Sequence, residues 1–293
     1  MSNAPFGRLL TAMVTPFTPS LEVDYDRAVE LARKLIADGN DGLIVAGTTG
    51  ESPTLSKAEK LELFKRVKQA VGKDIPIVAG TGSYATQATI ELSQAAAETG
   101  VDGLLLVAPY YNKPPQEGMF LHFQAIARAT RLPIMLYNIP GRTGIELLPE
   151  TLARLGEIPS IQAVKQSLPS LDPINELAIR SDLAQYSGDD GNTLPILALG
   201  GVGVVSVAGH VAAGLIKRQI EAFFAGQVAE AARLQRQLYP LFTGLFKTSN
   251  PILVKAALKK LGFPVGGLRP PLIEATPEQE QALDKVLAVT TAA

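Results

Sequence analysis

Short apolar runs alternate along most of the chain with stretches whose apolar residues recur at helical spacing. The apolar runs predict eight strands, at 9–17, 41–47, 76–82, 103–109, 133–140, 161–167, 183–190 and 203–209. The intervening segments predict helices, for example over 24–37 and from an N-cap at Ser56 to residue 71. Strands that are apolar throughout, without alternation, are typical of a parallel sheet that is buried on both faces.

Eight such βα units predict an α/β protein with the TIM (β/α)8 barrel fold. A doubly wound open sheet is the alternative, but the first βα turn lacks a G-x-G-x-x-G fingerprint. After residue 225 only helix-like segments follow, at 227–247, 251–261 and 278–290. We therefore expect residues 1–225 to form a catalytic barrel domain and residues 226–293 to form a C-terminal helical region.

Composition excludes several classes of function. The net charge of −1 and the absence of a basic block argue against nucleic acid or an anionic membrane surface as a partner. The chain has no cysteine, which excludes disulfides, thiol catalysis and cysteine-bound metals. With two histidines, and with GDDG (188–191) lacking EF-hand spacing, we expect neither a metal nor a cofactor. No leader or long apolar span is evident, so we expect a cytoplasmic protein.

Lys165 stands out among the fourteen lysines because it ends the apolar run IQAVK (161–165). The pattern places the other thirteen on polar helix faces or in loops. A buried ammonium group must either pair with a carboxylate or lose its proton. A pKa lowered by ~2–3 units would increase the neutral amine fraction by a factor of some hundreds, as a Schiff-base lysine requires. An ion-paired lysine, or one whose amine reaches solvent at a strand end, is the alternative.

Polar residues follow several of the other predicted strands. GTTGES (47–52) follows the second strand, PYYNKPP (109–115) the fourth, and NIPGRTG (138–144) follows Tyr137 on the fifth. Each alone has an ordinary explanation, such as a tight turn, a core tyrosine or a solvated arginine. In a TIM barrel, however, the carboxyl ends of the strands meet at the active site. We therefore expect these segments to surround Lys165.

The motifs GTTGES, PYYNKPPQEG and YNIPGRTG, followed by the lysine of the sixth strand, resemble the dihydrodipicolinate synthase family of pyruvate-dependent class I aldolases. The similarity extends from VTPF (14–17) to the C-terminal NPILVKAAL and GGLRPPL. The resemblance implies a lyase that condenses pyruvate with L-aspartate 4-semialdehyde to 4-hydroxy-tetrahydrodipicolinate, in the biosynthesis of diaminopimelate and lysine.

The resemblance also implies roles for individual residues. Lys165 would form the Schiff base with pyruvate, and Tyr137 would donate and accept protons at it. Thr48 would link Tyr137 to Tyr111 in a hydroxyl relay. Because Tyr111 would come from a neighbouring subunit, a homo-oligomer is implied, either a dimer or a tetramer.

Three further residues would bind the substrates. Thr49 and the backbone of Val205 would hold the pyruvate carboxylate and adjacent atoms. Arg142 would anchor the semialdehyde carboxylate, a task that suits a planar guanidinium group. The chain departs from the family after the lysine, where Gln166, Ser167, Leu168 and Pro169 replace a common Glu-Ala/Ser-Thr/Ser-Gly; we expect this to affect the pocket wall.

Two other functions remain open. A sugar-acid aldolase or sialic-acid-type lyase would share the lysine and the tyrosine, but such relatives often lack Arg142, which favours the synthase. A non-catalytic barrel that binds keto acids fits less well with the lysine and three relay hydroxyls.

Feedback inhibition by lysine is expected to be weak or absent. In lysine-sensitive relatives the inhibitor site has an acidic residue and an asparagine near the third helix, with histidines near the second. Here Ala88 and Tyr84 replace the first two, and Lys57 and Lys60 replace the histidines. A cationic inhibitor would therefore lose a carboxylate partner and face two added positive charges.

Overall fold

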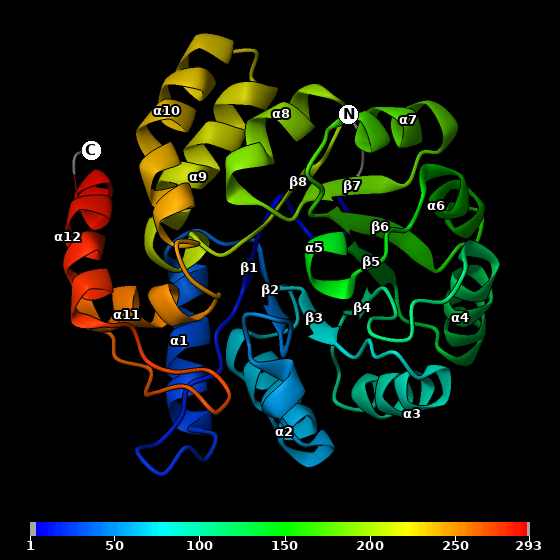
Figure 1. Ribbon diagram of the computed structural model, residues 1–293, viewed down its shortest axis with the longest axis horizontal. Helices are drawn as coiled ribbons and strands as arrows, with labels where there is room; N and C mark the ends of the chain where they lie inside the picture. Colours follow the sequence, from blue (N-terminus) through cyan, green and yellow to red (C-terminus); the bar gives the residue numbers. More distant parts are fainter. Residues whose placement is uncertain (1–3, 292–293) are drawn as a thin grey trace.

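The computed structural model describes residues 4–291, with side chains described as far as residue 288. Its centre is a closed barrel of eight parallel strands in the order β1 to β8 (Figure 1). The strands are β1 (Leu9–Ala12), β2 (Gly42–Val45), β3 (Ile77–Gly80), β4 (Gly103–Val107), β5 (Ile134–Asn138), β6 (Ile161–Gln166), β7 (Ala184–Ser187) and β8 (Gly203–Ser206). The predicted TIM barrel is confirmed, and each of the eight strands falls within a predicted run.

Helices connect successive strands and surround the barrel (Figure 1). Those between the strands are α1 (Tyr25–Ala37), α2 (Lys57–Val71), α3 (Thr86–Ala97), α4 (Gln116–Ala129), α5 (Pro140–Thr143), α6 (Pro149–Gly156), α7 (Asp172–Arg180) and α8 (Thr193–Ala198), with short 3-10 helices η1 (Ser52–Thr54) and η2 (Asp190–Asn192). After β8 follow α9 (Gly209–Phe224), α10 (Val228–Gly244), α11 (Ile252–Lys260) and α12 (Pro277–Thr291). In Figure 1 the last three lie together on one side of the molecule, beside α1 and α9.

The N-terminus of α2 is the one that the sequence predicts. Ser56 is the N-cap, and its hydroxyl accepts a hydrogen bond from the backbone N–H of Glu59, whose carboxylate accepts one from the backbone N–H of Ser56. This reciprocal capping box satisfies two N–H groups that the helix itself cannot pair. It also fixes Glu59 in the direction of the C-terminal segment.

The strands are shorter than the apolar runs that predict them. The first run extends to residue 17, but β1 ends at Ala12. Beyond it the backbone N–H of Val14 donates to Nε2 of His210, and that of Phe17 donates to the carbonyl of Val265. Val14 and Phe17 are thus buried in the core against α9 and the C-terminal segment, and they do not continue the ladder.

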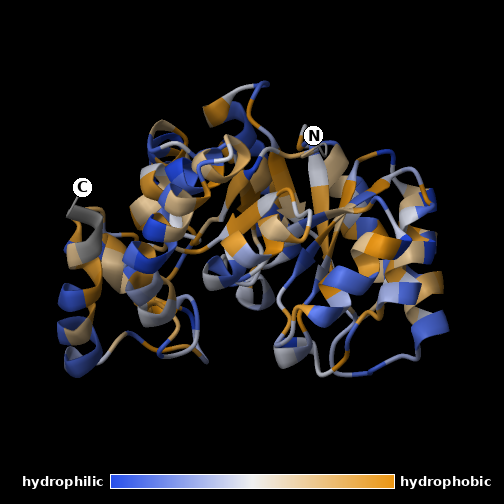
Figure 2. Cartoon of the chain, turned by 90° about the horizontal axis from the view of Figure 1, so that it is seen from above, coloured by the Kyte–Doolittle hydropathy of each residue, from blue (hydrophilic) through white to orange (hydrophobic). Residues whose placement is uncertain are grey.

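Pairing between β1 and β8 closes the barrel, with Leu10 opposite Val205. At Gly203 a side chain would fall on the carbonyl oxygen of Arg8, so only glycine permits this approach. Large apolar side chains, including Leu10, Ile44 and Met135, fill the interior. Figure 2 shows the same division, with hydrophobic residues on the strands and on the inner faces of the helices.

In the described part of the chain, no helix is both long enough and apolar enough to cross a bilayer.

Candidate active site

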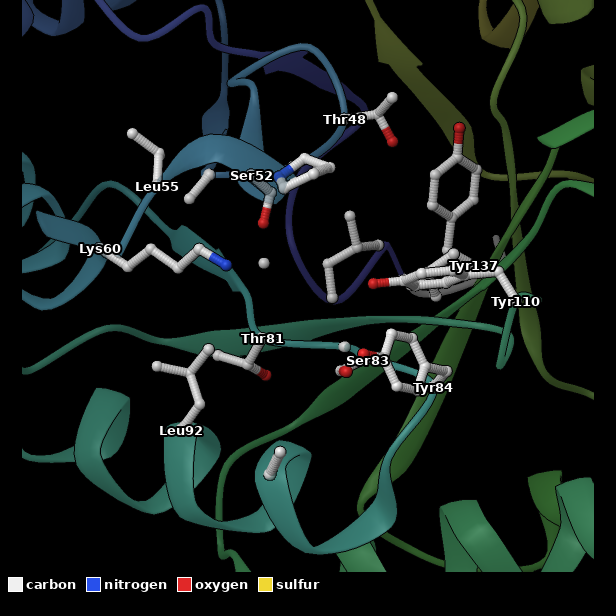
Figure 3. A pocket seen from close by; sticks show the side chains of 18 of the residues that line it. Thr48, Ser52, Leu55, Lys60, Thr81, Ser83, Tyr84, Leu92, Tyr110 and Tyr137 are labelled. Atoms are coloured by element: carbon white, nitrogen blue, oxygen red, sulfur yellow. The ribbon is translucent and has the colours of Figure 1, made fainter. Parts of the chain in front are cut away.

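A pocket of about 540 Å³ opens at the carboxyl ends of β2, β3, β4 and β5 (Figure 3). Thr48, Tyr137 and Arg142 line it. The residues that line it also include Ser52, Lys57, Lys60, Thr81, Ser83, Tyr84, Ala88, Glu91 and Tyr110. The strand ends therefore bring three of the sequence-predicted site residues to one cavity, as expected for a TIM barrel.

Thr48, Tyr137 and Arg142 reach the pocket from different elements. Thr48 follows β2, Tyr137 is the fourth residue of β5, and Arg142 belongs to the short α5. In Figure 3, Thr48 lies on the side of the pocket to which the Tyr137 hydroxyl points. Arg142 is exposed, and among the described residues it makes no ion pair. Its guanidinium group is thus available to an anionic ligand.

Lys165 lies on β6 with only 6% of its surface exposed. In the barrel ladder it stands between Tyr137 of β5 and Tyr186 of β7. Its Nζ lies 4.1 Å from the ring centroid of Tyr137. Within the described residues no carboxylate pairs directly with this amine, unlike the buried lysine discussed below. The amine is thus packed against the tyrosine that reaches the pocket, while Lys165 itself is not among the residues that line this cavity.

Two carboxyl groups of the SGDD segment act on this region at longer range. Burial raises the pKa of Asp189 to about 6, although the positive charge of Lys165 opposes the rise. Asp190 is fully buried and accepts hydrogen bonds from the Ser206 hydroxyl and from the backbone N–H groups of Val207 and Ala208. Asp190 therefore fixes the segment after β8, whereas the Asp189 carboxylate makes no hydrogen bond or ion pair within the described residues.

Thr49 and Val205 lie close to the barrel mouth but do not line the pocket. Val205 is fully buried on β8, where it pairs with Leu10. Thr49 is 3% exposed, and its hydroxyl accepts a hydrogen bond from Asn250 at 2.8 Å. Asn250 was missed by the sequence analysis, because no local signal connects residues that lie 201 positions apart.

Tyr111 is not part of the pocket of its own chain. Tyr111 is 89% exposed, and its backbone adopts the left-handed region with φ 69°. The preceding residue, Tyr110, lines the pocket instead and packs edge to face against Tyr84 at 5.1 Å between ring centroids. Tyr110 also was missed, although the YY pair was the signal that pointed to this loop.

One expectation about the lysines is wrong. Lys255 lies neither on a polar face nor in a loop; it is 3% exposed, and its Nζ is 2.6 Å from the Glu51 carboxylate and 2.7 Å from the carbonyl of Gly267. Helical periodicity alone could not reveal this, because α11 is buried on all sides from Ile252 to Leu258, where it packs against α12 and α9. Burial lowers the pKa of Lys255, and the charge of Glu51 opposes that effect.

Gln166 points away from the lysine and does not form the pocket wall. Its amide accepts from Asn138 at 3.1 Å and donates to Gln185 at 3.4 Å, which joins β5, β6 and β7 by side chains. Neighbouring residues of a strand face opposite sides, so Gln166 faces away from the barrel interior, toward which Ala163 and Lys165 point. Ser167 and Leu168 likewise do not line the cavity. The departure from the family pattern therefore lies outside the pocket that Arg142 reaches.

Both histidines are buried. Burial lowers the pKa of His122 and of His210 to about 4, so each is neutral at physiological pH. His122 bonds to Thr86, and His210 accepts from the backbone N–H of Val14. These contacts give both histidines a structural role.

A closed (β/α)8 barrel whose sixth strand carries a buried lysine against a tyrosine defines a class of protein, the aldolase-type enzymes that act through a lysine amine. The chain belongs to the dihydrodipicolinate synthetase family, whose model matches residues 5–290.

Its relatives agree over nearly the whole chain. It is 58% identical to 4-hydroxy-tetrahydrodipicolinate synthase of Heliobacterium modesticaldum, over 96% of this chain and 95% of that protein. It is 51% identical to the same enzyme of Desulforamulus reducens, over 98% of both. Dihydrodipicolinate synthase of Cyanidioschyzon merolae, a solved structure, superposes with a TM-score of 0.97 at 48% identity, over 99% of this chain and 100% of that one.

Proposed function

We propose that this enzyme condenses pyruvate with L-aspartate 4-semialdehyde through an imine on Lys165, giving 4-hydroxy-tetrahydrodipicolinate for diaminopimelate and lysine biosynthesis. The observation that carries the proposal is the buried Lys165 amine against Tyr137, which shares a pocket with Thr48 and Arg142. The relatives named 4-hydroxy-tetrahydrodipicolinate synthase, at up to 58% identity among those described above, support it. No cofactor is needed, because the imine that forms between Lys165 and pyruvate accepts the electron pair released when the methyl group loses its proton.

The chemistry follows from the amine. The neutral Lys165 nitrogen adds to the keto carbon of pyruvate, and loss of water leaves an imine. Loss of a proton from the methyl group gives an enamine, whose carbon forms a bond to the aldehyde carbon of the semialdehyde. The amino group of the second substrate then attacks the imine carbon and releases Lys165 as the ring closes. Tyr137, in contact with the amine, exchanges protons in the steps that make and break the imine.

The other residues divide the two substrates between them. The Thr49 hydroxyl and the backbone of Val205 hold the pyruvate carboxylate and adjacent atoms. Arg142, exposed at the pocket and without an ion-pair partner in the described chain, binds the carboxylate of the semialdehyde.

The relay to solvent is completed across a subunit boundary. Tyr111 projects away from its own pocket, so Thr48 connects Tyr137 to the Tyr111 of a partner subunit. The enzyme then works as a homo-oligomer, a dimer or a dimer of dimers. Residues 1–225 are its catalytic barrel and residues 226–293 its C-terminal helical region, and the enzyme acts in the cytoplasm.

Lys165 should be the residue that pyruvate modifies. Borohydride reduction in the presence of pyruvate, followed by peptide mass analysis, should place the adduct on the peptide that contains Lys165. Lys165→Ala and Lys165→Arg should both be inactive, because guanidinium stays protonated and cannot add to a carbonyl. Lys255 is the internal control in the same peptide map, since it is also buried but forms an ion pair with Glu51. An adduct on Lys255, or an active Lys165→Ala variant, would refute the mechanism.

Arg142→Ala should impair use of the semialdehyde far more than imine formation with pyruvate. Loss of a charge-assisted hydrogen-bonded pair costs about 1.5–3 kcal/mol, roughly ten- to a hundredfold in kcat/KM for the semialdehyde. Steady-state kinetics with both substrates, beside borohydride trapping with pyruvate alone, separate the two effects. Normal turnover of the semialdehyde by the variant would instead favour a sugar-acid aldolase, which a panel of sugar acids would then identify.

Mixing two inactive variants should show whether Tyr111 acts in a partner subunit. A hybrid of Lys165→Ala and Tyr111→Phe chains contains one doubly mutated site and one intact site, so random reassortment in equal amounts regenerates roughly a quarter of the sites. The matched control pairs Lys165→Ala with Tyr137→Phe, two residues of the same chain's site, and should regenerate none. No gain in activity for the first pair, with hybrids confirmed by mass spectrometry, would place Tyr111 in its own chain.

Lysine should inhibit this enzyme weakly or not at all. The relative from Cyanidioschyzon merolae was solved with lysine bound. Here Lys57, Lys60, Tyr84 and Ala88 line the pocket, and the Lys60 amine points into it (Figure 3). The carboxylate among the lining residues, Glu91, is exposed and already accepts a hydrogen bond from Gln87.

Activity assays over a lysine titration test this expectation. Ala88→Glu, which adds a carboxylate to the pocket, should increase sensitivity to lysine, because an opposite charge favours a cationic ligand. Strong inhibition of the unmodified enzyme by submillimolar lysine would contradict the expectation.

A further inference from the structure

Asn250 connects the C-terminal helices to the carboxyl end of β2. It lies in the turn between α10 and α11 and is 7% exposed. Its Nδ2 donates to the hydroxyl of Thr49 at 2.8 Å, and Thr49 is itself 3% exposed. A single buried hydrogen bond therefore joins the C-terminal region to a residue of the GTTGES loop.

The direction of this hydrogen bond determines what Thr49 can do. A threonine hydroxyl carries one proton and two lone pairs, and Asn250 occupies one lone pair. The proton is then free, and within the described chain the Thr49 hydroxyl donates to no protein acceptor. An ionised carboxylate offers acceptors only, so it is the natural partner of such a proton.

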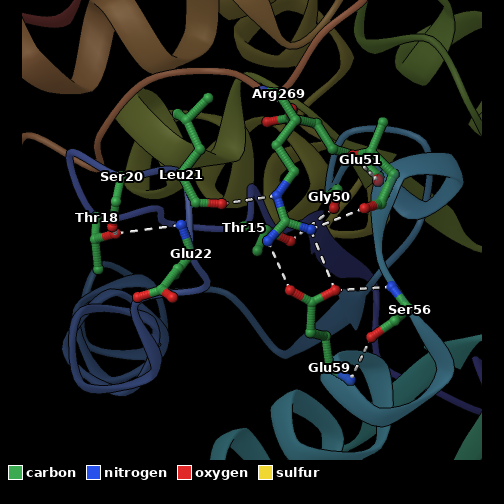
Figure 4. A network of polar contacts seen from close by, with 11 residues as sticks. Thr15, Thr18, Ser20, Leu21, Glu22, Gly50, Glu51, Ser56, Glu59 and Arg269 are labelled. Carbon is green, nitrogen blue, oxygen red and sulfur yellow. Dashed lines mark hydrogen bonds and ion pairs between the residues drawn. The ribbon is translucent and has the colours of Figure 1, made fainter.

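The loop that carries Thr49 is held from the same direction at a second point. Glu51 adopts the left-handed region, with φ 55°. Its carboxylate forms an ion pair with the Lys255 amine at 2.6 Å and accepts a hydrogen bond from the backbone N–H of Arg269 at 3.0 Å. Figure 4 shows Arg269 reaching Glu51 and also Glu59, the residue of the α2 capping box. Asn250 and Lys255 are five positions apart, so one short segment places both contacts.

We infer that Asn250 is a positioning residue of the carboxylate site, whose amide keeps the Thr49 proton directed at the carboxylate of pyruvate. The inference rests on the proposed function, in which Thr49 holds that carboxylate. The oxygen of the Asn250 amide, Oδ1, is buried without a hydrogen-bond partner in the described chain. A buried acceptor without a partner lowers the stability of the fold. An apolar side chain would fill this space without that cost, so space-filling alone does not explain an asparagine here.

The test compares two ketones that differ by the carboxylate. Borohydride trapping on Lys165 is measured against pyruvate concentration and against acetone concentration, in the full-length enzyme and in Asn250→Ala and Asn250→Asp. Asn250→Asp keeps the shape but accepts the Thr49 proton, and Asn250→Ala removes the donor without adding charge. Both should lower the efficiency of trapping by pyruvate, roughly ten- to a hundredfold for Asn250→Asp, and should leave trapping by acetone close to wild type.

Two controls separate positioning from folding. Asn40 is another buried asparagine bonded to a threonine, but there Thr11 donates to the amide oxygen and neither residue belongs to the GTTGES loop, so Asn40→Asp should leave the ratio of pyruvate to acetone trapping unchanged. In a Thr49→Val background the Asn250 substitutions should have no further effect on that ratio, because the proton they direct is gone.

The outcomes are distinguishable. If wild type gives no pyruvate adduct on Lys165, the proposed function itself fails. If wild type is trapped but the Asn250 variants keep the wild-type ratio, or lose pyruvate and acetone trapping equally, the positioning role is overturned. Should neither Asn250 variant fold, Thr49→Val alone decides, since an unchanged ratio in that variant also overturns the inference.

Discussion

Closure of the barrel by the pairing of β1 with β8 is the constraint on which the whole site depends. Once the sheet is closed, its eight carboxyl ends share one rim, and residues from distant parts of the chain become neighbours. Lys165 and Tyr137 then face each other across a single ladder step, and Thr48 is brought to the same mouth from β2. The packed interior below them removes water, which is why an amine at that position packs against an aromatic ring and is not solvated.

The C-terminal helices act on the same rim from outside the barrel. The buried pair of Lys255 and Glu51 adds little net stability by itself, because the cost of desolvating two charges largely offsets their attraction. Its effect is geometric. The two buried charges compensate each other only when the GTTGES loop adopts the conformation that brings Glu51 to Lys255. Arg269 adds a second fixed contact to Glu51 and connects it to the start of α2. A region that looks like an appendage in sequence thus shapes a loop of the site.

Much of the fold could be predicted from the sequence, because a strand that is buried on both faces appears as a short, mostly apolar run. Each predicted run from 41–47 to 203–209 contains a strand. The ends of the strands could not be predicted in the same way. Val14 and Phe17 are as apolar as β1, yet their backbone N–H groups bond to His210 and to Val265 and not to a neighbouring strand, and apolar character does not distinguish one kind of burial from the other.

The sequence by itself determined the barrel, the order of its motifs, the presence of Lys165, Tyr137 and Thr48 at strand ends and that of Arg142 in the segment after β5, because local periodicity and position along a strand carry that information. Only the tertiary structure decided which polar groups are partners. Lys255 was read as an ordinary helix lysine, and Asn250 as part of a loop, since their partners Glu51 and Thr49 lie about two hundred positions away. The exposure of Tyr111 also depends on the fold. Contacts between distant segments produce no periodic pattern in the sequence, so they can be identified only in the folded barrel.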